Sequence, residues 1–174
     1  LSGDSTITTL SVTGANLAMN GANTVTAAVF SGADARISGT NSFGTATFTA
    51  SATISESNSY DAFICTTVGV AGTDIAPSAA GITLTFGGGK TQTINAGGSF
   101  TVTGSSSALI TLTATSAPTS DQSSYWLLDA NPDEATVLVQ YALVSYAASR
   151  YVIGRFVNDS EEGAEHTTIN WFNG

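Results

Sequence analysis

The chain has 174 residues, enough for one domain with a substantial core, and 42% of them are hydrophobic. Charged residues make up only 10%, with 4 Lys and Arg against 13 Asp and Glu and a net charge of −9. This balance excludes nucleic-acid binding, which needs basic patches to neutralise phosphate, and it disfavours anionic membrane surfaces as partners. No apolar run has the length of about 20 residues that a membrane-spanning helix needs.

Residues 1–20 read LSGDSTITTLSVTGANLAMN and form the first feature of the chain. The sequence starts at Leu1, so either a leader has been removed or the chain has been trimmed. The low-charge composition favours removal of a secretory leader, and we expect an extracellular protein. Ile7, Leu10 and Val12 are apolar anchors in a segment rich in Thr and Gly. We expect residues 1–20 to be an N-terminal extension and residues 21–174 to be the folded domain. The extension is either a donor strand for a neighbouring subunit or the first strand of its own sheet.

Alternating apolar and hydroxyl residues predict strands along most of the chain. The clearest case is TATFTASATI at 45–54, in which every second residue is apolar. Clusters of Gly, Asn and Ser at 87–90, 95–98 and 104–107 predict hairpin turns. The predicted strands are 24–30, 45–54, 60–68, 81–86, 91–95, 98–103, 108–114, 124–128, 135–146, 150–157 and 167–172.

These short strands, without a convincing helix, predict an all-β fold. Half-buried alternation favours antiparallel sheets, and we therefore expect a single antiparallel β-sandwich or jelly roll with an extended N-terminal strand. No fixed-period repeat is visible, which disfavours a solenoid or a propeller.

No catalytic constellation is present, and we predict that the protein is not an enzyme. His166 is the only histidine and lies in a polar, acidic stretch, while Cys65, the only cysteine, lies in an apolar strand. One histidine and one cysteine also exclude an internal disulfide and a zinc site. Trp126 and Trp171 have apolar neighbours, so core positions are favoured over a sugar-binding role for both.

Two acidic clusters raise a calcium hypothesis. The first comprises Asp129, Asn131, Asp133 and Glu134, with the spacing that begins an EF-hand loop but without its later Gly and Glu. The second comprises Asp159, Glu161, Glu162 and Glu165. The alternative for both clusters is a solvated turn. Asn158 lies in the sequence Asn-Asp-Ser and is a candidate glycosylation site.

The Ser/Thr/Ala/Gly-rich strands, the absence of a disulfide and the apolar segment STITTLSVTG resemble extracellular filament subunits joined by donor-strand complementation. Archaeal bundling pili, threads and the calcium-assisted cannulae belong to this group. The resemblance implies a jelly-roll-like subunit whose N-terminal strand completes a neighbour, with calcium at subunit contacts.

We therefore predict a structural subunit of an extracellular filament or tube. It would polymerise head to tail through Ile7, Leu10 and Val12 as donor-strand anchors, with further copies of itself as partners. A viral capsid or fibre jelly roll and a carbohydrate-binding or adhesive module are the alternatives.

Overall fold

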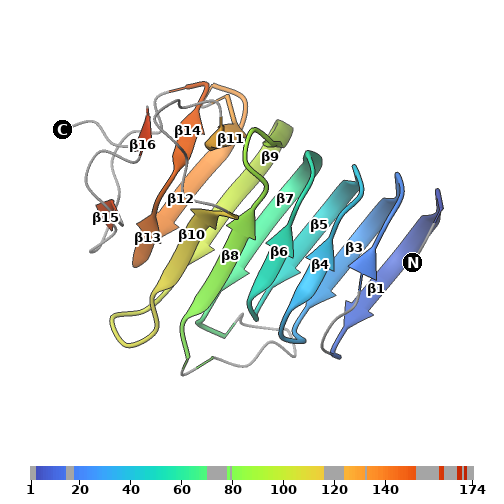
Figure 1. Ribbon diagram of the computed structural model, residues 1–174, viewed down its shortest axis with the longest axis horizontal. Coiled ribbons are helices and arrows are strands. Elements are labelled where there is room, and N and C mark those ends of the chain that lie inside the picture. The colour runs from blue at the N-terminus through green and yellow to red at the C-terminus, as the bar shows by residue number, and fades with distance from the viewer. Residues whose placement is uncertain are drawn as a thin grey trace.

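The computed structural model of the protein describes residues 3–14, 18–69, 78, 80–115, 124–131, 133–151, 161–162, 168–169 and 171. The strands of this part of the chain form two sheets, and all the paired strands within them run parallel (Figure 1). The larger sheet has nine strands in the order β1 (Thr6–Val12), β3 (Thr24–Phe30), β5 (Ser42–Phe48), β7 (Asn58–Thr66), β9 (Thr91–Thr103), β11 (Trp126–Asp129), β14 (Ala147–Ser149) and β16 (Thr168–Ile169), and β12 (Thr136–Gln140) also pairs with β9. The smaller has seven, in the order β15 (Glu161–Glu162), β13 (Ala142–Val144), β10 (Ile110–Ala114), β8 (Ile82–Phe86), β6 (Ala52–Ile54), β4 (Ala35–Ile37) and β2 (Ala18–Met19).

The chain passes between the two sheets as it winds. Over the first five coils, each coil adds one strand to the larger sheet and the next strand to the smaller one, so a strand pairs with its counterpart one coil later. Figure 1 shows the coils stacked from β1 at one end to β14 and β16 at the other. This winding is a parallel β-solenoid. In the described residues, no helix has the length and hydropathy that a membrane span requires.

The expected antiparallel sandwich or jelly roll is therefore wrong in strand direction and in topology, although the all-β class is correct. Alternation of apolar and polar residues indicates that one face of a sheet is buried and the other is solvated. Most parallel sheets are buried on both faces, which is why alternation favoured antiparallel pairing. In a solenoid the outer face of each parallel sheet meets solvent, so the same alternation arises.

A repeat of 18 residues is present in the first coils, contrary to our expectation. Thr6 pairs with Thr24 and Thr24 with Ser42, and the buried hydrogen bond between Asn23 and Asn41 spans the same 18 positions. The next step, from Asn41 to Asn58, spans 17 positions. Longer connections follow β7 and β10 and obscure the period in the rest of the sequence.

Corners between the sheets account for the differences in strand boundaries. The predicted strand 45–54 divides into β5 and β6, and the predicted strand 135–146 divides into β12 and β13 at Tyr141, whose φ is 50°. Residues 87–90 likewise connect β8 and β9 in different sheets and are not a hairpin. Residues 95–98 lie inside β9, where Gly97 has a φ of 77° and donates its N–H to the main-chain oxygen of Glu134. Residues 104–107 form a turn, but this turn connects β9 and β10 in different sheets, so the predicted hairpin is wrong here too.

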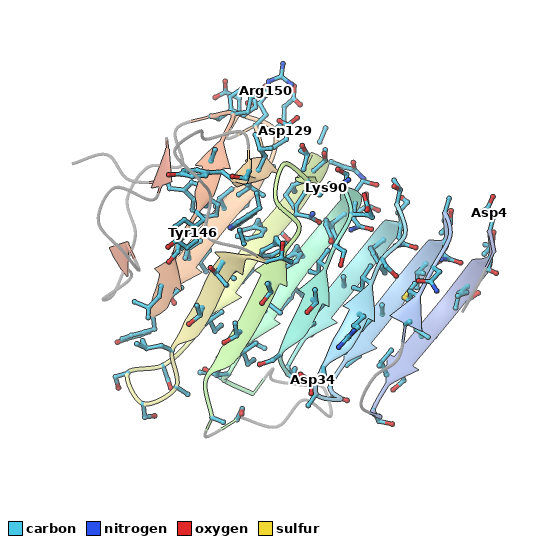
Figure 2. All side chains as sticks on the ribbon, viewed as in Figure 1. Asp4, Asp34, Lys90, Asp129, Tyr146 and Arg150 are labelled. Atoms are coloured by element: carbon cyan, nitrogen blue, oxygen red, sulfur yellow. The ribbon has the colours of Figure 1, made fainter. Side chains whose placement is uncertain are left out.

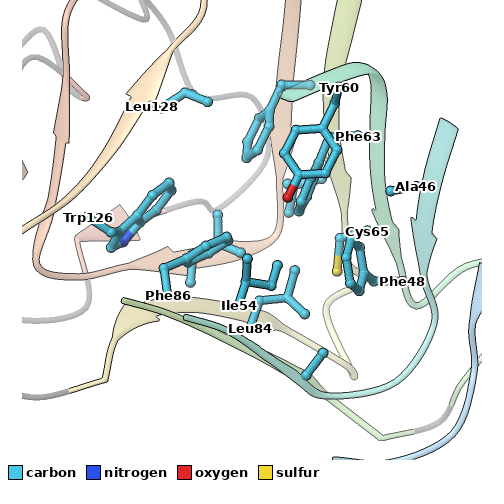
Figure 3. Packing of buried hydrophobic residues seen from close by; sticks show 14 of the residues in the cluster. Ala46, Phe48, Ile54, Tyr60, Phe63, Cys65, Leu84, Phe86, Trp126 and Leu128 are labelled. Atoms are coloured by element: carbon cyan, nitrogen blue, oxygen red, sulfur yellow. The ribbon is translucent and has the colours of Figure 1, made fainter. Parts of the chain in front are cut away.

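The core lies between the sheets and consists of side chains stacked coil upon coil. Figure 3 shows Phe86, Leu84 and Ile54 facing Tyr60, Phe63 and Phe48 across this space. The Phe63 ring lies 4.8 Å from that of Phe100 and 5.1 Å from that of Phe48, measured between centroids. Aromatic stacking of this kind adds to the stabilisation from apolar burial.

Candidate interaction surface at the first coil

Among the described strands, β1 has a neighbour on one side only, because it ends the larger sheet. The main-chain oxygen of Ser5 accepts a hydrogen bond from the N–H of Thr24, the first residue of β3. The main-chain oxygen of Val12 accepts one from the N–H of Ser31, the residue after β3. Main-chain groups of successive strand residues point to opposite sides. Those of Thr6 and Ser11 therefore point away from β3, to the free edge.

The sequence of this edge has none of the usual protection against strand pairing. Residues 5–14 contain no charged residue and no Pro. Native sheets block an exposed edge with such residues, because unpaired N–H and C=O groups are a template for another strand. The edge of β1 therefore presents main-chain N–H and C=O groups to a further strand, and residues 5–14 hold no charge and no Pro that would block it.

The three predicted donor-strand anchors lie on β1 and face the core of their own chain. Val12 is 3% exposed, whereas Ile7 and Leu10 are only partly buried and pack against the core cluster. Their counterparts one coil later, Val25 and Ala28, are 0% and 1% exposed. Ile7 and Leu10 differ from these counterparts because no described coil covers them.

A ladder of buried asparagines connects the first coils, and our sequence interpretation missed it. The Asn23 side-chain amide donates to Oδ1 of Asn41 at 2.9 Å, and that of Asn41 donates to Oδ1 of Asn58 at 3.0 Å. Within the described residues, the buried Oδ1 of Asn23 has no hydrogen-bond partner, because the corresponding residue of the first coil is Ser5. The signal was available in the sequence as Gly-x-Asn at 21–23 and 39–41.

The first predicted calcium cluster forms a turn with internal hydrogen bonds to Asn131. Oδ1 of Asn131 accepts the N–H of Asp133 at 3.1 Å, and the main-chain oxygen of Asn131 accepts the N–H of Glu134 at 2.9 Å. The carboxylate of Asp129 pairs with Arg150 at 3.4 Å. In the part of the chain that the structure describes, no group of three acidic, histidine or cysteine side chains is placed to hold a metal ion.

Two of the four residues of the second cluster, Asp159 and Glu165, lie outside the described residues. The candidate glycosylation site Asn158 and the histidine His166 also lie outside them. The main chain of Glu161 and Glu162 forms β15, which pairs with Leu143 and Val144 of β13.

The buried reactive groups are held in their unreactive forms. Burial raises the pKa of the Cys65 thiol and that of the Tyr60 hydroxyl well above their ordinary values. Tyr60 donates its hydroxyl to Oε1 of Gln92 at 2.9 Å. Trp126 and Trp171 are 0% exposed, which agrees with the core positions that the sequence favoured.

Most charged residues of the described part of the chain lie at strand ends or in turns, and Arg36 in β4 and Asp61 in β7 are exceptions. Lys90 forms an ion pair of 2.6 Å with Glu56 at a corner between sheets, and both side chains are 38% exposed. Figure 2 places the labelled charged residues at the ends of strands or in turns, namely Asp4, Asp34, Lys90, Asp129 and Arg150. The edge of β1 thus stands apart as an uncharged main-chain surface.

Comparison with protein-family models, with curated proteins and with solved structures gives no match for this sequence.

Proposed function

We propose that this chain is a structural subunit of an extracellular assembly and that it associates with further copies of itself by strand addition at β1. The observation that supports the proposal is the edge itself, a seven-residue strand with one β-neighbour among the described strands, no charge and no Pro. Strand addition pairs main-chain groups that are otherwise left to water and extends an existing sheet. The low charge and hydroxyl-rich composition are the reasons for an extracellular setting.

Strand addition suits this fold better than insertion of residues 1–13 into a groove of a neighbour. Insertion would break the pairing of β1 with β3, which extends from Thr6 to Val12, and would uncover Val25 and Phe30 below it. Strand addition uses the free edge and keeps every existing hydrogen bond. It also covers Ile7 and Leu10, which are the half-exposed end of the core.

The alternatives have weaker support. A carbohydrate-binding module would need exposed aromatic rings, whereas Trp126 and Trp171 are buried in the core and their rings lie 5.2 Å apart. A capsid or fibre jelly roll requires a topology that this solenoid does not have.

Two substitutions on β1 test the proposal by blocking its edge. Ser11→Pro removes an N–H group that points to the free edge, and Pro is tolerated at such positions of edge strands. Thr9→Lys places a charge on an exposed position of the same strand. We expect the wild-type protein to associate as its concentration rises, and each variant to require at least tenfold more protein for the same degree of association.

Thr45→Lys is the matched control, because Thr45 lies two strands inside the sheet in the same cross-strand row as Thr9. It changes the net charge equally and leaves the edge intact, so we expect it to associate like the wild type. Sedimentation velocity measures the association, and circular dichroism shows whether each variant is folded. A wild-type protein that stays monomeric, or a folded Thr9→Lys that associates normally, would contradict the proposal.

A further inference from the structure

We infer that the strand added to β1 is the β1 strand of a second copy, paired antiparallel about a two-fold axis. This inference rests on the proposed function and specifies its partner and geometry. The joint is a head-to-head contact between two solenoids, and it closes after two copies, because a two-fold contact uses the same surface on both partners.

The opposite ends of the two sheets are β15 and β16, of which the structure describes two residues each. A second β1 is a partner strand whose seven residues are all described. The choice of a second β1 rests on the residue pattern of β1 itself.

The pattern of inward-facing residues makes β1 complementary to itself. Ile7 and Leu10 face the core with two residues between them, because the pairing of β1 with β3 is interrupted at Thr8 and Thr26 and the alternation of inward and outward residues shifts there. The pattern is therefore symmetric about the midpoint between residues 8 and 9. Antiparallel pairing about this midpoint places Ile7 beside Leu10 of the second copy, and Leu10 beside its Ile7, so both half-exposed side chains gain an apolar neighbour.

The same register is correct for the hydrogen bonds. It places Thr6 opposite Ser11 of the second copy, and both residues direct their N–H and C=O groups to the free edge. Residues that oppose one another with both groups facing inward form the hydrogen-bonded pairs of an antiparallel ladder. The apolar contact between Ile7 and Leu10 and the hydrogen-bonded pair of Thr6 and Ser11 thus require the same register.

Charge is compatible with this joint, and its small area makes it weak. The nearest charged residue, Asp4, falls opposite Thr13 of the second copy, and the two Asp4 residues lie about 30 Å apart along the strands. Strands ~23 Å long in sheets ~10 Å apart outline an end face of roughly 230 Å² per copy, or about 500 Å² for the pair. This area is below that of a stable specific interface, so the dimer should be weak and dissociate readily.

Cysteine crosslinking tests the register. Thr6→Cys and Ser11→Cys are made separately, mixed in equal amounts and kept in oxidised glutathione. Opposed residues of a hydrogen-bonded pair have Cα atoms ~5.5 Å apart, within reach of a disulfide. We expect a disulfide-linked dimer in the mixture and little in either variant alone, because identical positions would be about 17 Å apart.

The matched control is the pair Thr24→Cys and Val29→Cys, which has the same spacing on β3, one strand inside the sheet. We expect no crosslinked dimer from this pair. Native Cys65 is buried and does not contribute.

The assembled mass separates the two proposals. A mass that levels off at two subunits, with the 6–11 crosslink, supports the two-fold joint. Polymers that lengthen with concentration and lack this crosslink would overturn the joint and leave strand addition at β1 in place. A protein that stays monomeric would overturn both.

Discussion

Nδ2 of Asn41 donates to Oδ1 of Asn58 at 3.0 Å, and this hydrogen bond connects two coils inside the protein. Oδ1 of Asn58 also accepts the main-chain N–H of Asn41, at 2.8 Å. Asn23 repeats both contacts with Asn41, at 2.9 and 3.2 Å. The amide of Asn41 therefore satisfies polar groups on both neighbouring coils, and buried polar groups are costly when they lack partners.

Replacing the central residue of the ladder tests its contribution to stability. Asn41→Ala removes the acceptor of two Asn23 N–H groups and one donor to Asn58, so several buried groups lose a partner. We expect the free energy of unfolding to fall by about 2–4 kcal/mol, as measured by urea denaturation. The control is Asn95→Ala, which removes a surface hydrogen bond of 2.8 Å to Asp61 and should cost less than about 0.5 kcal/mol. Equal losses in the two variants would show that the ladder has no special role.

Extending the ladder by one coil should stabilise the protein. Oδ1 of Asn23 is buried and has no partner among the described residues, and Ser5 occupies the ladder position of the coil before it. An amide at this position can donate to Oδ1 of Asn23, so we expect Ser5→Asn to raise the free energy of unfolding by about 1 kcal/mol. Ser5→Asp is the control, since an ionised carboxylate of similar size only accepts hydrogen bonds. Ser5→Asn should melt at a higher temperature than Ser5→Asp, and the opposite order would contradict the prediction.

Several strands were predictable from the sequence because their signal is local. The segment 24–30 matches β3, and β8 and β10 lie within the predicted segments 81–86 and 108–114. Strand direction and pairing were not predictable in this way. An outward-facing Thr between two buried residues occurs in parallel and in antiparallel sheets alike. The residue pattern therefore does not predict which strand lies beside it or in which direction that strand runs.

The features of the first coil required knowledge of the coil period. With the 18-residue repeat, Asn23 and Asn41 fall at equivalent positions and the ladder can be inferred. Without it, each Asn has the appearance of a turn residue. Residues 1–20 were expected to hold either a donor strand or the first strand of the chain's own sheet, and the sequence alone could not show that Ile7 and Leu10 belong to the core of their own chain.

Close packing of the coils at their corners predicts which glycines can be replaced. A Cβ on Gly39 would overlap the main-chain oxygen of Gly21 in the preceding coil. Backbone cannot move aside as a side chain does, so we expect Gly39→Ala to lose about 3 kcal/mol or more, or to prevent folding. Gly14→Ala is the control, because a Cβ there would meet no described heavy atom within 4 Å beyond its chain neighbours, and the φ of Gly14 is not positive. Thermal melting of the two variants compares them, and a Gly39→Ala protein as stable as Gly14→Ala would contradict the stacking.

Alkaline pH should destabilise the protein through two buried groups. Burial raises the pKa of the Cys65 thiol and of the Tyr60 hydroxyl, so the folded chain keeps protons that the unfolded chain releases above about pH 8.5 and about pH 10. Above these values the unfolded state binds fewer protons than the folded state. The free energy of unfolding therefore falls as pH rises, by up to about 1.4 kcal/mol per pH unit for each group. Below about pH 8.5 neither group contributes to the pH dependence.

Urea denaturation between about pH 7 and about pH 11 measures this dependence, and Cys65→Ala isolates the thiol. The variant loses some stability at every pH because it removes buried volume, but its stability should stay level until Tyr60 begins to titrate. The difference between wild type and variant should therefore shrink as pH rises past about 8.5, since only the wild type releases a thiol proton on unfolding. A difference that is constant over the whole range would mean that the thiol ionises equally in both states, contrary to its burial at 0% exposure.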